Sequence, residues 1–135
     1  MKNTFEYGDS KSYRVVVKEE DTPNFIALPK EQGGGEVHPV YSTYAIARDA
    51  EWCGRLFVLE MKEEDEEGIG TMISIEHVAP AFVGDEVFFT STLESVSGNE
   101  IITSFEARVG DKLIARGKTG QKILKKEKVK QLLRK

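Results

Sequence analysis

The segment YSTYAIARDAEWCGRLFVLEM, residues 41–61, decides the fold, because it has the pattern of a helix that needs cover on most of its sides. When its side chains are projected at about 100° per residue, they form two apolar faces and one narrow polar stripe. The first apolar face contains Ile46, Ala50, Cys53 and Phe57, the second contains Ala45, Trp52, Leu56 and Leu59, and the stripe contains Arg48, Glu51 and Arg55. A helix that is apolar over most of its circumference is buried by surrounding structure. The rest of the chain must therefore supply a wrapping layer.

Strand patterns supply that layer. Residues 71–79, 86–96, 100–109 and 112–124 alternate apolar and polar side chains and are rich in β-branched and aromatic residues. Turn sequences separate them at residues 84–85, 97–99 and 110–111. Residues 13–19 alternate in the same way before the helix. This order predicts an α+β domain in which a strongly twisted antiparallel sheet wraps one long central helix.

The length and composition limit the class of protein. With 135 residues the chain is too short for two ordinary domains, so we expect a single domain over residues 1–135. It is 39% hydrophobic and 31% charged, and no apolar run approaches the length of a membrane span. Its one cysteine excludes an internal disulfide framework. We therefore expect a cytoplasmic protein with no membrane partner.

The net charge of −4 conceals an asymmetry along the chain. Residues 60–67 carry six carboxylates against one lysine, whereas residues 118–135 carry eight basic side chains against Glu127. The basic region could steer a polyanion, such as a phosphate-bearing cofactor or a nucleic acid. Alternatively, residues 126–135 form a solvated basic helix or tail in which Val129, Leu132 and Leu133 pack down. We favour the helix and expect no nucleic acid partner, because the region lacks aromatic side chains on which bases could stack.

Thr43, Glu51 and His77 are the candidate catalytic residues. Thr43 stands at the start of the predicted helix, Glu51 follows eight residues later, and His77 ends the next strand. A hydroxyl, a carboxylate and an imidazole that converge from different elements can activate water or transfer an acyl group. Each residue also has a structural interpretation. Thr43 can cap the helix, Glu51 can pair with the arginines three residues before and four after it, and His77 can be a core histidine.

Three other features also have both a structural and a functional interpretation. Gly33–Gly35 could admit a ligand close to the backbone, but a flexible connector is more typical of such a run. Cys53 lies on an apolar face of the helix and is expected in the core, with a nucleophilic thiol as the alternative. His38 has no partner at metal-ligand spacing, so we interpret it as a loop residue.

The motifs VYST-(x)7-E, GTMISIEHVAPAFVGDEV and ARGKTG, taken together, resemble the small hotdog-fold thioesterases related to fluoroacetyl-CoA thioesterase. The resemblance covers roughly residues 37–124. In that family a Thr near the helix start, a Glu eight positions on and a His at the end of the next strand form the catalytic set, which corresponds here to Thr43, Glu51 and His77. A glycine seven residues before the His lies against the substrate in the family and corresponds to Gly70.

This resemblance implies a hotdog-fold homodimer that hydrolyses a small acyl-CoA, with coenzyme A as part of the substrate and no metal or other cofactor. The family often has a His and an Arg in the last strand, where this chain has Thr119 and Gln121, so the acyl group is not implied. If the substrate carries coenzyme A, its phosphates should meet basic side chains near the cleft. Arg116, Lys118 and Lys122 share one face of the last predicted strand and are the candidates.

Two other functions stay open at this point. A noncatalytic module would bind or sense acyl-CoA without turnover. A hotdog enoyl-CoA hydratase is the rival enzyme, but it usually needs an Asp and a His a few residues apart, a spacing that Asp49 and His77 do not have.

Overall fold

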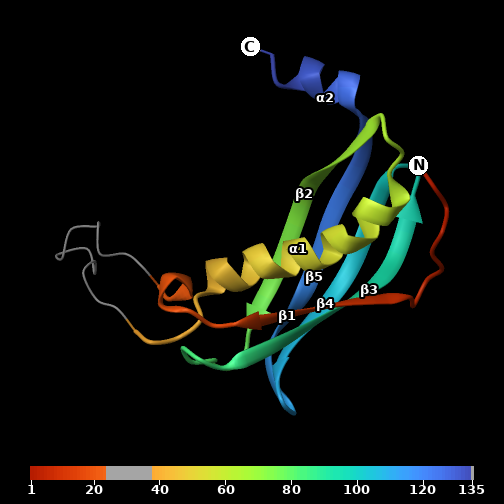
Figure 1. Cartoon of the computed structure of the whole chain (residues 1–135). Coiled ribbons are helices and arrows are strands. Elements are labelled where there is room, and N and C mark those ends of the chain that lie inside the picture. The colour runs from red at the N-terminus through yellow and green to blue at the C-terminus, as the bar shows by residue number, and fades with distance from the viewer. Residues whose placement is uncertain (24–37, 135) are drawn as a thin grey trace.

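A five-stranded antiparallel sheet curves around one face of a single long helix (Figure 1). The computed structural model describes residues 1–23 and 38–134. The strands are β1 (Ser10–Val16), β2 (Glu66–His77), β3 (Glu86–Ser97), β4 (Glu100–Val109) and β5 (Lys112–Lys125), in the spatial order β1-β3-β4-β5-β2. The helix is α1 (Thr43–Met61), the short helix α2 (Lys126–Leu132) follows β5, and a 3-10 turn (Glu19–Asp21) follows β1. The predicted sheet around one helix is confirmed, whereas Gly33–Gly35 lie outside the described residues.

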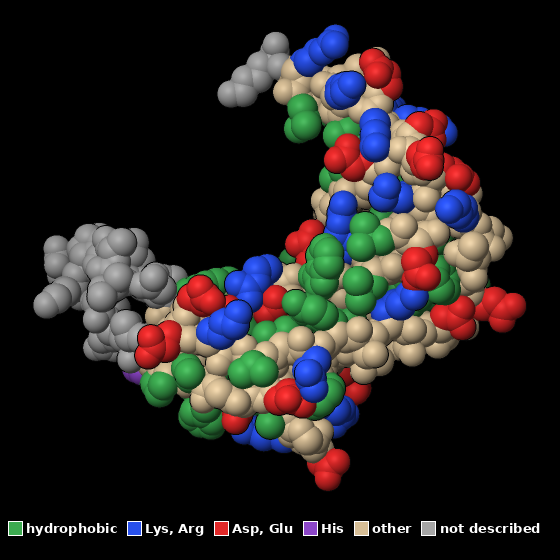
Figure 2. Space-filling view, in the orientation of Figure 1, with side chains coloured by type: hydrophobic (Ala, Val, Ile, Leu, Met, Phe, Trp, Pro, Cys, Tyr) green, Lys and Arg blue, Asp and Glu red, His purple; other side chains and the backbone are tan. Residues whose placement is uncertain are grey.

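Only one side of α1 is covered. The first predicted apolar face is buried against the sheet, where Ile46, Ala50, Cys53 and Phe57 are all fully buried. The second face is different, because Trp52 and Leu59 remain 42% and 40% exposed. Figure 2, which views the side of the molecule that carries α1, shows hydrophobic side chains gathered over the helix. The sheet therefore covers one side of the helix, and the second apolar face has no cover among the described residues of a single chain.

A close approach of α1 to the sheet is possible because residue 54 is glycine. A Cβ at Gly54 would lie 2.9 Å from Oγ1 of Thr103 and closer still to Oγ1 of Thr119. Those two buried hydroxyls hydrogen-bond to each other at 2.7 Å, so each has a partner beneath the helix. Aromatic side chains of the sheet and of the helix approach, including Tyr41, Phe89 and Phe105, form the core on this side.

Strand β2 is an edge strand, and it begins five residues earlier than predicted. The acidic sequence before Gly68 suggests a loop, but Glu66 is only 6% exposed. Its carboxylate accepts a hydrogen bond from the backbone N–H of Glu63 at 2.8 Å and pairs with the Met1 ammonium group at 2.7 Å. These tertiary contacts allow a carboxylate at the start of the strand. Further along, the pairing with β5 shifts register between Gly70 and Met72.

The basic C-terminal segment forms α2, as one of the two interpretations predicts. Only Val129 is buried, however, whereas Leu132 and Leu133 are 61% and 77% exposed. The expected packing of all three apolar residues is thus correct only for Val129. In the described ranges no helix is long and apolar enough to cross a membrane.

Candidate active site

The start of α1 brings Thr43 to His77. Ser42, not Thr43, caps the helix, because its side-chain oxygen accepts a hydrogen bond from the N–H of Ala45 at 3.1 Å. Thr43 is therefore the first helical residue and its hydroxyl is available for another contact. Its Oγ1 lies 2.9 Å from Nδ1 of His77, the last residue of β2, across 34 positions of sequence. The predicted convergence of these two residues is present in the fold.

The other ring nitrogen of His77, Nε2, is buried and has no hydrogen-bond partner in the part of the chain that the structure describes. Most buried polar atoms are paired, so an unpaired one needs an explanation such as a ligand. The hydrogen bond between Nδ1 and Thr43 orients the imidazole and leaves Nε2 as the ring nitrogen without a partner among the described residues.

Glu51 lies two turns further along α1, about 12 Å from Thr43 along the helix axis. Its carboxylate touches Gly70 of β2, where a Cβ would come within 3.3 Å of Cδ of Glu51 and would overlap Oε1. Glu51 and Gly70 line a hollow of about 300 Å³ together with Thr71, Met72 and Ile73. Within one chain, no contact joins Glu51 to Thr43 or to His77 among the described residues.

The two arginines that could have paired with Glu51 are used elsewhere. Arg48 pairs with Asp21 at 2.9 Å and with Asp49 at 3.0 Å. Arg55 donates to the backbone carbonyl of Gly68 at 3.0 Å. Glu51 has no ion pair among the described residues. The salt bridges with Arg48 and Arg55 that the helical spacing allows are therefore not formed there.

A polar cluster at the start of α1 was not anticipated. The hydroxyl of Tyr41 donates to Asp49, and Arg48 holds both Asp49 and Asp21. Burial, followed by the hydrogen bond to Asp49, raises the pKa of Tyr41, so its hydroxyl stays a neutral donor. The hydrogen bond to Asp49 is the main cause that raises the pKa of Arg48, which stays charged. The feature of the sequence that could have indicated this cluster is Asp49, a carboxylate that lies beside the apolar faces of the predicted helix.

The three basic candidates lie on the sheet face that points away from α1. Arg116, Lys118 and Lys122 are exposed and alternate along β5 with the buried Thr119 and Gln121, which face the helix. Their shared face is as predicted, but it is opposite to the face that carries the pair of Thr43 and His77.

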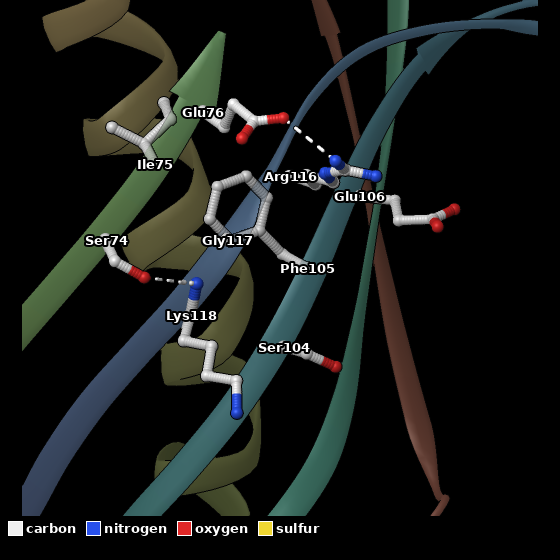
Figure 3. A pocket seen from close by; sticks show the side chains of 9 residues that line it. All are labelled: Ser74, Ile75, Glu76, Ser104, Phe105, Glu106, Arg116, Gly117 and Lys118. Atoms are coloured by element: carbon white, nitrogen blue, oxygen red, sulfur yellow. Dashed lines mark hydrogen bonds and ion pairs between the residues drawn. The ribbon is translucent and has the colours of Figure 1, made fainter. Parts of the chain in front are cut away.

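Part of this outer face forms a shallow groove of about 540 Å³ along β5 (Figure 3). Arg116 pairs there with Glu76 at 2.9 Å, and Glu106 lines the groove opposite Arg116 on the neighbouring strand, while Lys118 lies further along β5. Two cations therefore face two carboxylates in the groove. Lys118 and Lys122 have no ion pair among the described residues.

Cys53 belongs to the core and not to the site. The side chain is fully buried, and burial raises the pKa of its thiol. A protonated, inaccessible thiol is a poor nucleophile, which supports the core interpretation. Among the described residues, no group of three or more His, Cys, Asp or Glu side chains is placed to hold a metal ion.

The chain matches known proteins over most of its length. Residues 17–127 match the model of the fluoroacetyl-CoA-specific thioesterase family. A hypothetical protein of Thermus thermophilus, described as a thioesterase superfamily member, has 36% sequence identity and a TM-score of 0.87, with 96% of this chain and 91% of that chain covered. A comparison with curated protein sequences gave no match.

More distant structures agree in fold. The fluoroacetyl-CoA thioesterase FlK has 23% identity and a TM-score of 0.85, with 97% of this chain and 96% of that chain covered. A hot-dog-like protein from Thermanaerovibrio acidaminovorans has 20% identity and a TM-score of 0.83, with coverage of 96% and 90%. The hotdog fold predicted from the sequence is thus confirmed. Because the family model spans most of the chain and the arrangement of helix and sheet agrees, this protein belongs to the fluoroacetyl-CoA-specific thioesterase family and is a hotdog-fold acyl-CoA thioesterase.

Proposed function

We propose that the protein hydrolyses a small acyl-CoA with Thr43, Glu51 and His77 acting as one catalytic set. The observation that carries this proposal is the contact between Thr43 and Nδ1 of His77, together with a buried Nε2 that has no hydrogen-bond partner among the described residues. A site that already holds one ring nitrogen and leaves the other for a ligand suits acid–base chemistry on a bound thioester.

The geometry suggests a role for each group. The thioester carbonyl would lie near Thr43, where free backbone N–H groups at the helix start can stabilise a developing oxyanion. Glu51 would take a proton from water as the water oxygen adds to the carbonyl carbon, or would attack that carbon itself and form an anhydride that water then cleaves. In either case the C–S bond breaks and the thiolate of coenzyme A receives a proton, for which His77 is the proposed donor. Gly70 would let the substrate approach the backbone beside Glu51.

We also propose that the active unit is a homodimer. Strand β2 is an edge of the sheet, and its side chains Met72 and Ile73 are 42% and 40% exposed. The side of α1 that carries the exposed Trp52 is also uncovered. An edge strand and an apolar helix side both call for cover, and a second copy supplies it by a symmetric pairing of the two β2 strands. Coverage of the second apolar face by a partner would also account for the helix pattern in the sequence.

Such a pairing bears on how Glu51 reaches the other two residues. In an antiparallel pair of identical strands, the Gly70 region of one β2 lies beside the His77 end of the other. The partner's Glu51 would then approach the pair of Thr43 and His77. We propose that each site combines residues from both copies in this way.

Alanine variants test the catalytic set. If the three residues act together, Thr43→Ala, Glu51→Ala and His77→Ala should each lower turnover by roughly 10²–10⁴-fold, and double variants should lose little more than single ones. The assay is release of free thiol from a panel of acyl-CoAs, with melting curves to show that each variant is folded. Near-normal turnover by folded Glu51→Ala and His77→Ala would sink the proposal. Acyl-CoA binding by calorimetry without any thiol release would indicate a noncatalytic binding module instead.

A mixing experiment tests the shared site. Glu51→Ala and His77→Ala chains, each nearly inactive, are unfolded together and refolded. If sites are shared, a mixed dimer has one site with both changes and one intact site, so random pairing restores about a quarter of normal activity. If each copy carries its own complete site, every site in the mixture is damaged and activity stays at the level of the single variants.

The phosphates of coenzyme A are the proposed ligands of the basic face of β5. Lys118 and Lys122, whose ammonium groups have no ion pair among the described residues, are the stronger candidates, and Arg116 would have to leave Glu76. Their placement away from Thr43 suits the nucleotide end of the substrate and not its acyl end. We further propose that residues 1–135 work as one domain in the cytoplasm, where acyl-CoA esters are available and a free cysteine such as Cys53 is stable.

A further inference from the structure

Two buried carboxylates near the start of α1 lie outside the proposed catalytic set. Asp21 and Asp49 are only 4% and 5% exposed. They share the guanidinium of Arg48, whose Nη2 lies 2.9 Å from Oδ1 of Asp21 and 3.0 Å from Oδ2 of Asp49, while its Nε donates to Oδ1 of Asp49 at 3.0 Å. Asp49 also accepts the hydroxyl of the fully buried Tyr41. Burial of ionised groups is costly unless they are paired and hydrogen-bonded, so these four residues form one unit, named here the carboxylate network.

The carboxylate network lies directly against the backbone around Thr43. The N–H of Ser42 donates to the backbone carbonyl of Asp21 at 2.9 Å. On the other side of Thr43, the hydroxyl of Tyr44 donates to the backbone carbonyl of Thr22 at 3.0 Å. Both neighbours of Thr43 are therefore tied to the turn that Asp21 occupies.

Tyr41 adds a third anchor. Its N–H donates to the backbone carbonyl of Ala81 at 2.9 Å, which connects the approach to α1 with the segment that follows β2. The network thus joins the turn after β1, the start of α1 and the residues just beyond His77. The hydrogen bond between Thr43 and His77 depends on the relative placement of these same elements.

We propose that Tyr41, Arg48, Asp21 and Asp49 are positioning residues that hold the Thr43 hydroxyl in hydrogen-bond contact with Nδ1 of His77. This inference rests on the proposed function for its effect on catalysis, but its structural part concerns the contact itself. The alternative is that the network only satisfies the two buried carboxylates, with Arg48 exposed to solvent on its outer side, and has no effect on the site. The two interpretations differ in what a mild change should do to turnover and to the imidazole.

Tyr41→Phe is the mildest probe, because it removes the hydroxyl and leaves the aromatic ring in the core. Asp49 then loses one donor, and Arg48 and Asp21 are free to shift. A displacement of about 1 Å at a reacting group can cost on the order of 10²-fold in rate, so we expect kcat to fall at least about 10-fold with KM within about twofold. Arg48→Met should have the larger effect, and Arg48→Lys should recover only part of it, because an ammonium group cannot reproduce the forked geometry of the guanidinium.

The background variant Thr43→Ala separates positioning from general stability. If the network acts through Thr43, Tyr41→Phe should cost little further activity once the Thr43 hydroxyl is gone. Glu66→Gln is the matched control, because Glu66 is also a buried, paired carboxylate but lies at the opposite end of β2 from His77. It should lower the melting temperature and leave kcat unchanged.

The nitrogen-15 NMR spectrum of the imidazoles supplies a test that does not need turnover. The chain has only two histidines, so His38 serves as an internal reference for His77. Tyr41→Phe should shift Nδ1 of His77 in the same direction as Thr43→Ala and leave the His38 signals in place. An unchanged His77 spectrum with a lowered melting temperature would overturn the inference. An inactive parent protein in which Tyr41→Phe still shifts His77 would sink the proposed function while supporting the positioning role.

Discussion

Replacement of Gly70 by alanine is a direct test of whether the Glu51 carboxylate must stay where the fold places it. The added Cβ would lie 3.3 Å from Cδ of Glu51. Its distance to Oε1 of Glu51 would be well below 3.0 Å, a separation that real Cβ atoms essentially never show. Since unstrained contacts involving carbon lie near 3.5 Å or beyond, the carboxylate must move by about 1 Å. It is the end of a flexible, solvent-exposed side chain, so this movement should cost little stability.

The same movement should be expensive for catalysis. A misplacement of about 1 Å can lower the rate on the order of 10²-fold, or about 2.7 kcal/mol of activation free energy. We therefore expect Gly70→Ala to lower kcat by roughly 100-fold in the thiol-release assay and to keep a melting temperature close to that of the parent. If Gly70 served only to admit the substrate, KM would rise and kcat would be nearly unchanged.

Gly68→Ala is the matched control on the same strand. A Cβ at Gly68 would meet Cγ1 of Val58 and lie 3.3 Å from Nη1 of Arg55, so its nearest atoms belong to Val58 and Arg55 and not to Glu51. It should lower stability and spare kcat. In addition, Gly70→Ala should have little further effect in a Glu51→Ala background. A folded Gly70→Ala protein with kcat within twofold of the parent would refute the reasoning.

Three further predictions concern the core, the outer face of the sheet and the edge strand. Because burial raises the pKa of the Cys53 thiol, the thiol stays protonated at pH 8, and mass spectrometry should find it unmodified by iodoacetamide until the protein is denatured; rapid labelling of the native protein would contradict its burial. Combined reversal of Lys118 and Lys122 to Glu should raise KM for acyl-CoA several-fold at low salt and less at high salt, and an unchanged KM would place the phosphates elsewhere. Trp52→Asp and Met72→Asp should each convert the dimer to a monomer in analytical ultracentrifugation and abolish turnover. A dimer that persists in both variants would show that these side chains do not form the interface.

Much of the site was predictable because its residues sit at ends of elements that the sequence marks clearly. The alternation before Pro80 places His77 at the inward end of a strand, and the serine and threonine after Pro39 mark a helix start. The contact between Thr43 and His77 follows once the strand and the helix are joined in the expected order. Which of the two hydroxyl residues caps the helix was not predictable, because Ser42 and Thr43 have similar capping ability and differ only in what lies opposite them.

Pairing of charged side chains was the least predictable part. Helical spacing allows Glu51 to pair with Arg48 and Arg55, yet Arg48 is taken by Asp21 and Asp49. Helical spacing describes neighbours on one helix, but the competing partner Asp21 comes from a turn 27 positions away. A carboxylate that is already buried gains more from a cation than an exposed one does, since a buried charge without a partner is costly.

The sequence alone determined the element order, because apolar periodicity and turn chemistry act over a few residues and are readable along the chain. The hotdog architecture and the favoured roles of the candidate catalytic residues came from the motifs that resemble a known family. Only the tertiary structure decided that Glu51 rests on Gly70 with no ion pair among the described residues. It also decided that the basic residues of β5 face away from Thr43, and that two buried carboxylates share the exposed guanidinium of Arg48 beside the start of α1. The physical reason is that these features depend on which side chains from distant segments are buried together, and burial sets the cost of leaving a charge or a hydrogen bond unpaired.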